Sequence, residues 1–309
     1  MVIPLPGIAD GNRRHTGLKE STHALASSLR RALNIGMRYS ALCLGLTVYG
    51  LVVSAAEVKT APVPTVAELK RFAAEEAVQG VAVDAEYAYV IADHAIGKYR
   101  KADGQKVANW TAPKGSGIKH LNAGTVLKGK LYCAHSNFPA KPDESSIEIF
   151  DVATLQPVGR QVFNCPPGSL TWALPYQGGW LTCFAHYAPL SDNGLSRIVN
   201  YDAAWQELRR WNFPPALLQR FGLSSSSGAS LLAGERLIVS GHDAKELYAL
   251  ALPPAGGELR WEATWPFLSA GQAFDTDPSE PQAGPDFVLY SIQRKTKEVV
   301  VGRYQFPPR

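Results

Sequence analysis

The chain has 309 residues, of which 46% are apolar and 19% are charged, a composition that is typical of a globular protein and excludes a disordered one. The formal net charge of +4 arises in residues 1–38, where six Lys and Arg side chains stand against two acidic ones. The remainder is therefore close to neutral. This gives no support to nucleic-acid binding, and we expect no such partner.

An uncharged apolar run occupies residues 40–56 and is preceded by a basic flank. At 17 residues it is shorter than the ~20 residues that a membrane-spanning helix needs. The small residues Ser54 and Ala56 suit cleavage by a signal peptidase before Glu57. We therefore predict that residues 1–56 form a basic N-terminal region with a signal peptide.

This assignment predicts export, either to the periplasm or out of the cell, with residues 57–309 as the mature domain. An uncleaved N-terminal anchor at residues 40–56 is the main alternative, and it would be the protein's one link to a membrane. A buried core helix is a weaker alternative, because nothing amphipathic surrounds the run. Either Met1 or Met37 is the true start of the chain.

From residue 66 onward the chain is a succession of short strand-like segments separated by turn residues. We expect these segments to group in units of four, as in the blades of a propeller. The expected strands of the first four units are residues 78–84, 87–92, 96–100 and 106–111; 121–127, 130–134, 146–151 and 158–163; 170–174, 180–185, 197–201 and 206–213; and 229–232, 236–240, 246–252 and 259–265.

The fifth unit has only three expected strands, at residues 272–275, 287–292 and 297–306. Residues 66–74 supply a spare strand at the opposite end of the chain. We therefore predict that this segment closes the last blade as its outer strand, because the pairing would remove an exposed sheet edge.

An apolar run that ends on a histidine recurs along the chain, at His94, His135, His186 and His242. Arg294 holds the fifth position, and successive markers are 41, 51, 56 and 52 residues apart. A strand-rich repeat of about 40–50 residues is the signature of a propeller. We therefore predict an all-β fold, a five-bladed β-propeller with its last blade closed by the N-terminal strand. A β-sandwich would also contain many short strands, but not in this repeating order.

The four histidines all follow the second expected strand of a unit, so a propeller would direct them toward one end of its channel. Imidazole is a common ligand of transition metals, and four rings in a circle favour an open, square-based geometry. The predicted ligands of a divalent transition metal, iron or copper in preference to zinc, are His94, His135, His186 and His242. Asp93 and Asp243 are candidates to orient the rings. The alternative is a structural histidine that is repeated by common descent and held by hydrogen bonds.

The starts of the first strands carry polar side chains at the same end of the predicted channel. The candidate ligand-binding residues are Gln79, Asn122, Ser169, Thr171, Ser227 and Gln272. His120 is the candidate general acid or base, and Arg294 is a candidate catalytic residue that could hold a carboxylate through two hydrogen bonds. The alternative for each is a structural hydrogen bond or, for Arg294, a solvated turn.

The predicted mature part holds three cysteines, and an odd number leaves at least one thiol unpaired in an exported protein. Cys133 and Cys183 precede marker histidines on expected strands, where we expect them to be small core residues. The sequence contains no GxSxG, HExxH or CxxC motif, which excludes these kinds of nucleophile and metal site.

Several segments resemble those of bacterial exported β-propeller proteins that are labelled cycloisomerases or cyclases. The segments are residues 79–84, 120–124, 133–137, 169–172 and 241–243, and the resemblance spans roughly residues 65–305. It implies a propeller fold and an isomerase activity of the cycloisomerase or lactonase kind.

Together these observations predict an exported, metal-dependent enzyme that acts on a small carboxylated or cyclic molecule at the channel mouth. We expect a small-molecule substrate as its partner and a monomeric state. The alternative is a non-catalytic propeller that serves as a binding or scaffold module through its rim.

Overall fold

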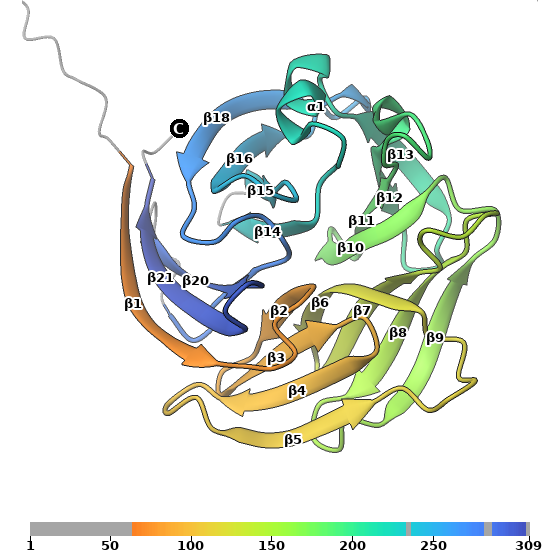
Figure 1. The fold of residues 1–309 in the computed structure, drawn as a ribbon. Helices are drawn as coiled ribbons and strands as arrows, with labels where there is room; N and C mark the ends of the chain where they lie inside the picture. The colour runs from red at the N-terminus through yellow and green to blue at the C-terminus, as the bar shows by residue number, and fades with distance from the viewer. Residues whose placement is uncertain (1–63, 233–235, 281–285, 307–309) are drawn as a thin grey trace, which may run out of the picture. The chain divides into compact units, whose positions relative to one another are not determined.

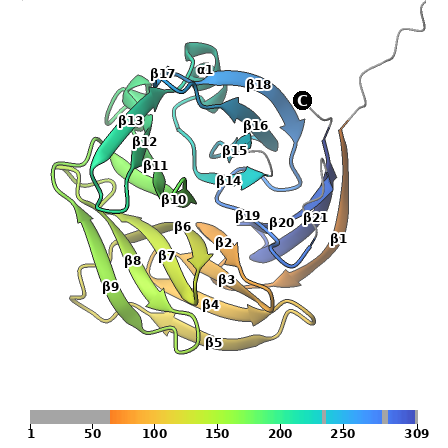
Figure 2. The same ribbon diagram turned by 180° about the vertical axis from the view of Figure 1, so that it is seen from behind.

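The structure is a computed structural model, and it describes residues 64–232, 236–280 and 286–306. Five small sheets are arranged in a ring around a central axis, as Figures 1 and 2 show from opposite sides. This architecture confirms the predicted all-β, five-bladed propeller. The predictions for residues 1–56 lie outside the described residues. No helix in the described part of the chain combines the length and the apolar character that crossing a membrane requires.

Each of the first four blades takes its strands in chain order from the axis outward. These strands are β2 (Gly80–Val83), β3 (Tyr87–Ala92), β4 (Ala95–Arg100) and β5 (Lys106–Thr111); β6 (His120–Leu127), β7 (Lys130–Ser136), β8 (Ser145–Asp151) and β9 (Pro157–Phe163); β10 (Ser169–Tyr176), β11 (Gly179–Ala185), β12 (Arg197–Tyr201) and β13 (Glu207–Asn212); and β14 (Gly228–Leu232), β15 (Arg236–Ser240), β16 (Glu246–Ala251) and β18 (Arg260–Pro266).

Three short elements lie between these strands. The 3₁₀ helix η1 (Asn193–Leu195) and the helix α1 (Pro215–Phe221) belong to the loops of the third and fourth blades. The two-residue strand β17 (Gly257–Glu258) pairs in parallel with β13, so the fourth blade extends the outer edge of the third.

The fifth blade combines the two ends of the described chain. It contains β19 (Asp275–Thr276), β20 (Asp286–Gln293) and β21 (Glu298–Gln305), and its outer strand is β1 (Thr65–Ala73), which pairs antiparallel with β21. In Figure 1 the orange β1 lies along the outside of the dark blue β21. The burial of β1 agrees with an edge position, since most of its residues are exposed.

Contacts of β1 also reach the first blade. The Phe72 ring lies 5.8 Å from the Tyr99 ring on β4, and the Lys70 ammonium donates a hydrogen bond to the carbonyl of Lys101. Arg71 forms an ion pair with Glu298 of β21 at 3.1 Å. One strand therefore contacts both the last blade and the first.

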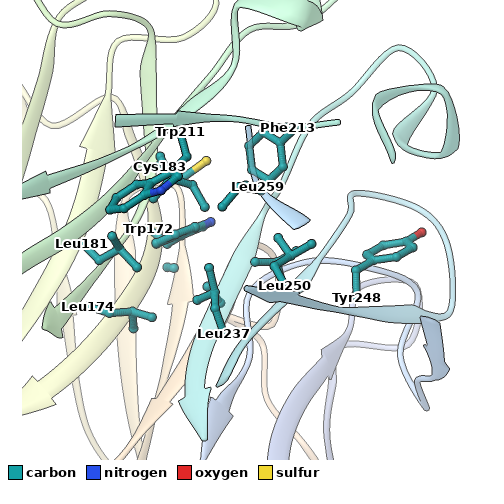
Figure 3. Close-up of a cluster of buried hydrophobic side chains, with 14 of the residues drawn as sticks. Trp172, Leu174, Leu181, Cys183, Trp211, Phe213, Leu237, Tyr248, Leu250 and Leu259 are labelled. Atoms are coloured by element: carbon teal, nitrogen blue, oxygen red, sulfur yellow. The ribbon is translucent and has the colours of Figure 1, made fainter. Parts of the chain in front are cut away.

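The apolar core is divided among the gaps between neighbouring blades. Five clusters of buried side chains occur in the described residues, and each lies mainly between two adjacent sheets. Figure 3 shows the cluster between the third and fourth blades, where Trp172 and Trp211 meet Leu237 and Leu250. The indole Nε1 of Trp172 donates to Ser226 Oγ at 2.9 Å, so its polar atom is satisfied inside the core.

The cysteines agree with their predicted roles. Cys133 and Cys183 are buried, and burial raises the pKa of the Cys183 thiol to about 12. Cys165 is exposed, and none of these three thiols is in a disulfide.

Innermost strands of neighbouring blades meet near the axis. The amide N–H of Ala273 donates to the carbonyl of Gln79 at 3.1 Å, which joins the fifth blade to the first. A Cβ atom on Gly80 would lie 2.4 Å from the Cβ of Ala273, so only glycine allows this approach. The channel is therefore narrow at this level.

Removal of β1 is expected to open the ring. A chain that starts at residue 76 exposes the edge of β21 and loses the contacts of Phe72 and Lys70. We therefore expect aggregation or loss of cooperative unfolding, measured by size-exclusion chromatography and thermal unfolding. A chain that starts at residue 57 is the matched control and should behave as the full chain does. Unchanged solubility and melting temperature in the shorter chain would contradict a closing role for β1.

Candidate functional site

A pocket of about 340 Å³, called the axial pocket below, draws its lining from all five blades. Starts of innermost strands and loops after second strands converge on it, as the repeat predicts. The lining residues are Gln79, His120, Asn122, Phe138, Thr171, Tyr187, Ala188, Leu223, Ser224, Ser227, His242, Gln272 and Arg294.

The axial pocket gathers most of the residues that the sequence singled out. The predicted site residues that line it are Gln79, Asn122, Thr171, Ser227, Gln272, His120, Arg294 and His242. Four others do not line it, namely Ser169, His94, His135 and His186. A larger cavity of about 610 Å³ lies at the outer rim beside Cys165 and Trp205, but none of the predicted site residues lines it.

His120 is oriented by a carboxylate from the neighbouring blade. Its Nδ1 lies 2.8 Å from Asp93 Oδ1, and Asp93 also accepts from Gln79 Nε2 at 2.7 Å. The hydrogen bond with His120 is the main reason that the pKa of Asp93 is lowered. An ionised Asp93 keeps the proton of a neutral His120 on Nδ1, so the lone pair is on Nε2. Within the described residues Nε2 has no hydrogen-bond partner.

Asp93 was expected to orient a metal-bound ring, and it orients His120 instead. The residue lies in the turn between β3 and β4, and its carbonyl accepts the amide N–H of Leu121 at 3.0 Å. Backbone and side chain of Asp93 therefore both hold the start of β6, where His120 is the first residue.

Arg294 and His242 form a second polar pair at the pocket. Nδ1 of His242 lies 2.7 Å from Asp243 Oδ1, as predicted, and a guanidinium nitrogen of Arg294 lies 3.4 Å from Nε2. Arg294 has no carboxylate partner in the described part of the chain, whereas most arginines there are paired with Asp or Glu. The pocket therefore has an unneutralised positive charge.

Three amide side chains of the pocket share one arrangement. Asn122 Nδ2 donates to the carbonyl of Leu170 at 2.8 Å, and Gln272 Nε2 donates to the carbonyl of His242 at 3.0 Å. Gln79 uses its amide nitrogen on Asp93. Each side-chain amide thus uses an N–H in a hydrogen bond within the protein, and its oxygen remains available as an acceptor.

Backbone irregularities place two of the pocket residues. Pairing of β6 with β7 skips from Leu121 to Gly124, and pairing of β10 with β11 skips from Leu170 to Trp172. Asn122 and Thr171 lie in these bulges, which re-aim side chains. Gln272 has a positive φ of 68°, an uncommon value for a residue with a side chain.

Ser169, predicted as a ligand-binding residue, does not line the axial pocket. Ser169 is buried and pairs in register with Ala185, in the regular part of β10 before the bulge. In an unbroken strand Ser169 and Thr171 would point the same way. The bulge separates them, and only Thr171 reaches the pocket.

The predicted metal ring is not assembled. In the residues that the structure describes, no group of three or more His, Cys, Asp or Glu side chains is arranged to hold a metal ion. His94 is exposed in the turn between β3 and β4. The prediction of iron or copper at these four histidines therefore has no matching ligand set in the described part of the chain.

Hydrogen bonds within the protein occupy both ring nitrogens of His135 and His186. His135 Nε2 accepts the Lys119 amide at 3.0 Å, and its Nδ1 lies 2.9 Å from Ser146 Oγ. His186 Nε2 lies 2.7 Å from the carbonyl of Pro167, and its Nδ1 lies 2.8 Å from Ser191 Oγ. No lone pair is left for a metal, so the structural alternative describes these two histidines.

An apolar side of the pocket was missed by the sequence analysis. Phe138 and Tyr187 lie with their ring centroids 4.8 Å apart, and the Phe138 ring lies 6.0 Å from that of His120. Leu223 adds an exposed leucine at the edge. Phe138 and Tyr187 follow marker histidines by three residues and one, so their position in the repeat was the available signal.

Comparisons with known proteins leave the activity open. No protein-family model and no curated protein matches the chain. A luciferin-regenerating enzyme is 9% identical, with 79% of this chain and 95% of that chain covered and a TM-score of 0.46. A protein of unknown function from Bacteroides caccae is 12% identical, with 68% and 64% covered and a TM-score of 0.38. Hydrazine synthase from Kuenenia stuttgartiensis is 12% identical, with 70% and 68% covered and a TM-score of 0.40.

Similarity at this level carries no argument about the reaction. None of the comparisons supports the specific cycloisomerase group, which therefore stays a prediction.

Substitution of three of the marker histidines should separate structural roles from metal binding. His135→Ala leaves buried partners unpaired, so we expect a loss of about 1–3 kcal/mol in the free energy of unfolding, with a similar effect for His186→Ala. His94→Ala should change it by less than about 0.5 kcal/mol. Thermal unfolding and elemental analysis of each variant provide the test. Stoichiometric metal in the unaltered protein that is lost in His135→Ala or His186→Ala would instead support the predicted metal ring.

Burial lowers the pKa of His135 to about 4, from 6.5 for an unperturbed imidazole. Between these values the unfolded chain binds a proton that the folded chain does not, so stability should fall as the pH drops through this range. The shift corresponds to on the order of 3 kcal/mol. We expect His135→Asn to weaken the pH dependence of the free energy of unfolding, measured by urea unfolding between about pH 7 and about pH 5. His94→Asn is the exposed control, and an unchanged slope in His135→Asn would contradict the assignment.

Proposed function

We propose that the protein is an enzyme that acts on a small carboxylated or cyclic molecule in the axial pocket. One observation carries the proposal: Arg294, a cation without a carboxylate partner in the described residues, lines the same pocket as His120, whose tautomer is set by Asp93. A guanidinium pairs with carboxylates through charge-assisted hydrogen bonds. A neutral imidazole with an accessible lone pair is suited to general-base catalysis near neutral pH.

The chemistry that these groups support best is the interconversion of a cyclic ester and a carboxylate. In the opening direction, His120 Nε2 takes a proton from a water molecule, and the water oxygen adds to the ester carbonyl. The ring C–O bond then breaks, and the leaving oxygen takes the proton from the imidazolium. Arg294 stabilises the negative charge that develops on the carbonyl oxygen and then holds the carboxylate of the product. Asp93 stabilises the imidazolium between these steps.

The resemblance to propellers labelled cycloisomerases supports the same class of molecule. In such a reaction a carboxylate of the substrate adds to a carbon–carbon double bond and forms a lactone, and the neighbouring carbon gains a proton. The imidazolium form of His120, protonated from solvent, would donate that proton from Nε2, and Arg294 would position the carboxylate. Export is part of this proposal and is supported by the composition of residues 1–56. A monomeric state is also part of the proposal.

A binding or scaffold role has less support. The exposed large apolar side chains of the sheets are Leu69, Val107, Val158, Val162 and Leu208. These five are distributed over the outer strands of four blades, β1, β5, β9 and β13. Three further exposed leucines, Leu190, Leu195 and Leu223, lie in the loops that follow β11 and α1. Scattered apolar residues are normal on a surface, whereas a docking face would show a contiguous patch.

Turnover of small lactones and unsaturated carboxylates tests the proposal. Lactone opening is followed by acid release, and lactonisation of an unsaturated monocarboxylate by loss of the absorbance of its conjugated double bond. His120→Gln should lower kcat by about 10²–10⁴-fold, because the base is lost. Arg294→Gln should lower kcat/KM by tenfold or more, and Arg209→Gln on β13 is the matched control. Absence of both turnover and binding across the panel, or turnover that is unaffected by both substitutions, would contradict the proposal.

A further inference from the structure

The axial pocket has one side made of aromatic rings, called the aromatic wall here and formed by His120, Phe138 and Tyr187. Ring centroids are 6.0 Å apart between His120 and Phe138 and 4.8 Å apart between Phe138 and Tyr187. Phe138 and Tyr187 are only half-buried, and Leu223 beside them is 69% exposed. Apolar surface is thus left uncovered at the place where a ligand would lie.

Hydrogen bonds hold this side in place. The amide N–H of Ala188 donates to the carbonyl of Leu223 at 3.0 Å. Asn193 Nδ2 donates to the carbonyls of Gly222 and Ser224, at 2.8 and 3.2 Å. The loop that follows Tyr187 and the leucine edge are therefore held together before a ligand binds, which lowers the entropic cost of binding a rigid ligand.

The charge and size of the pocket restrict the ligand further. Arg294 is the single Lys or Arg among the described lining residues, and no Asp or Glu lines the pocket. One carboxylate on the ligand would neutralise the charge of Arg294, whereas a second carboxylate would lack a cationic partner. A volume of about 340 Å³ is near the lower limit for ligand pockets, so the molecule is small.

Tyr187 adds a polar group to the wall. Burial raises the pKa of its phenol, so the hydroxyl stays protonated. The hydroxyl makes no hydrogen bond within the described part of the chain, so it can donate to a ligand. The wall thus offers ring faces for stacking together with one directional donor.

We propose that the axial pocket is selective for an aromatic monocarboxylate, whose carboxylate pairs with Arg294 and whose ring packs on Phe138 and Tyr187. This inference rests on the proposed function and narrows its substrate class. Aromatic pairs with centroids 4.5–7 Å apart contribute about 0.5–1.5 kcal/mol beyond the burial of their area. That contribution corresponds to an affinity gain between about twofold and about tenfold over a saturated ring of similar size.

Calorimetric titration of the full chain with four probes tests the proposal. The probes are benzoate, cyclohexanecarboxylate, acetate and benzamide. Benzoate should bind a few-fold tighter than cyclohexanecarboxylate, which matches its charge and approximate size but not its aromatic ring. It should bind at least tenfold tighter than acetate, which lacks the ring, and benzamide, which lacks the charge.

Two substitutions assign the contacts. Phe138→Leu keeps apolar volume but removes one of the two rings, so it should reduce the preference for benzoate and leave the affinity for cyclohexanecarboxylate unchanged. Arg294→Gln should weaken all carboxylates at least tenfold. Tyr87→Leu removes an aromatic ring outside the pocket and is the matched control. Thermal unfolding of each variant verifies that it is folded.

The possible results separate this inference from the proposed function. Equal affinity for benzoate and cyclohexanecarboxylate, with both dependent on Arg294, would overturn the aromatic selectivity and leave a carboxylate pocket. Failure of all carboxylates to bind would overturn both proposals. Benzoate binding that is unaffected by Phe138→Leu and Arg294→Gln would place the ligand elsewhere and would also overturn the inference.

Discussion

Each sheet has two faces to cover, and in the residues that the structure describes most of the apolar surface that covers them comes from the two neighbouring sheets. The five clusters of buried side chains accordingly lie between blades and none of them belongs to a single blade. A ring that stops short would expose one face at each end. Closure of the ring is therefore the constraint on which the fold depends. The apolar side chains between the last and first blades are buried only when these two blades are in contact, so their hydrophobic stabilisation requires closure.

The candidate site depends on the same closure, because its interactions cross from blade to blade. The hydrogen bond of Asp93 with His120 joins the first blade to the second, and Asn122 donates to a carbonyl of the third. Arg294 of the fifth blade approaches His242 of the fourth. Neither the Asp93–His120 pair nor the Arg294–His242 pair lies within one blade. A change in the angle between the first and second blades would therefore alter the orientation of the proposed base, and one between the fourth and fifth blades would alter that of the cation.

The marker histidines show how small backbone differences separate residues that look equivalent. His135 is still inside β7, which ends at Ser136, whereas His186 is the first residue after β11. His242 follows the end of β15 by two residues. Successive side chains of a strand point to opposite faces, so a shift of one residue sends the ring to another environment. His135 is consequently buried in a hydrogen-bond network with Ser146, while His242 reaches the pocket.

The amino-acid sequence by itself determined the number of blades, the order of their strands and the end of the channel where polar groups gather. Those features follow from the alternation of apolar and polar residues within short segments and from the length of the repeat, both of which are visible along the chain. The tertiary structure alone decided that Asp93 serves His120 of the next blade and that Thr171 enters the pocket while Ser169 does not. Both outcomes depend on bulges and on contacts between blades. Such contacts join residues that are far apart in the chain, and no local pattern specifies them.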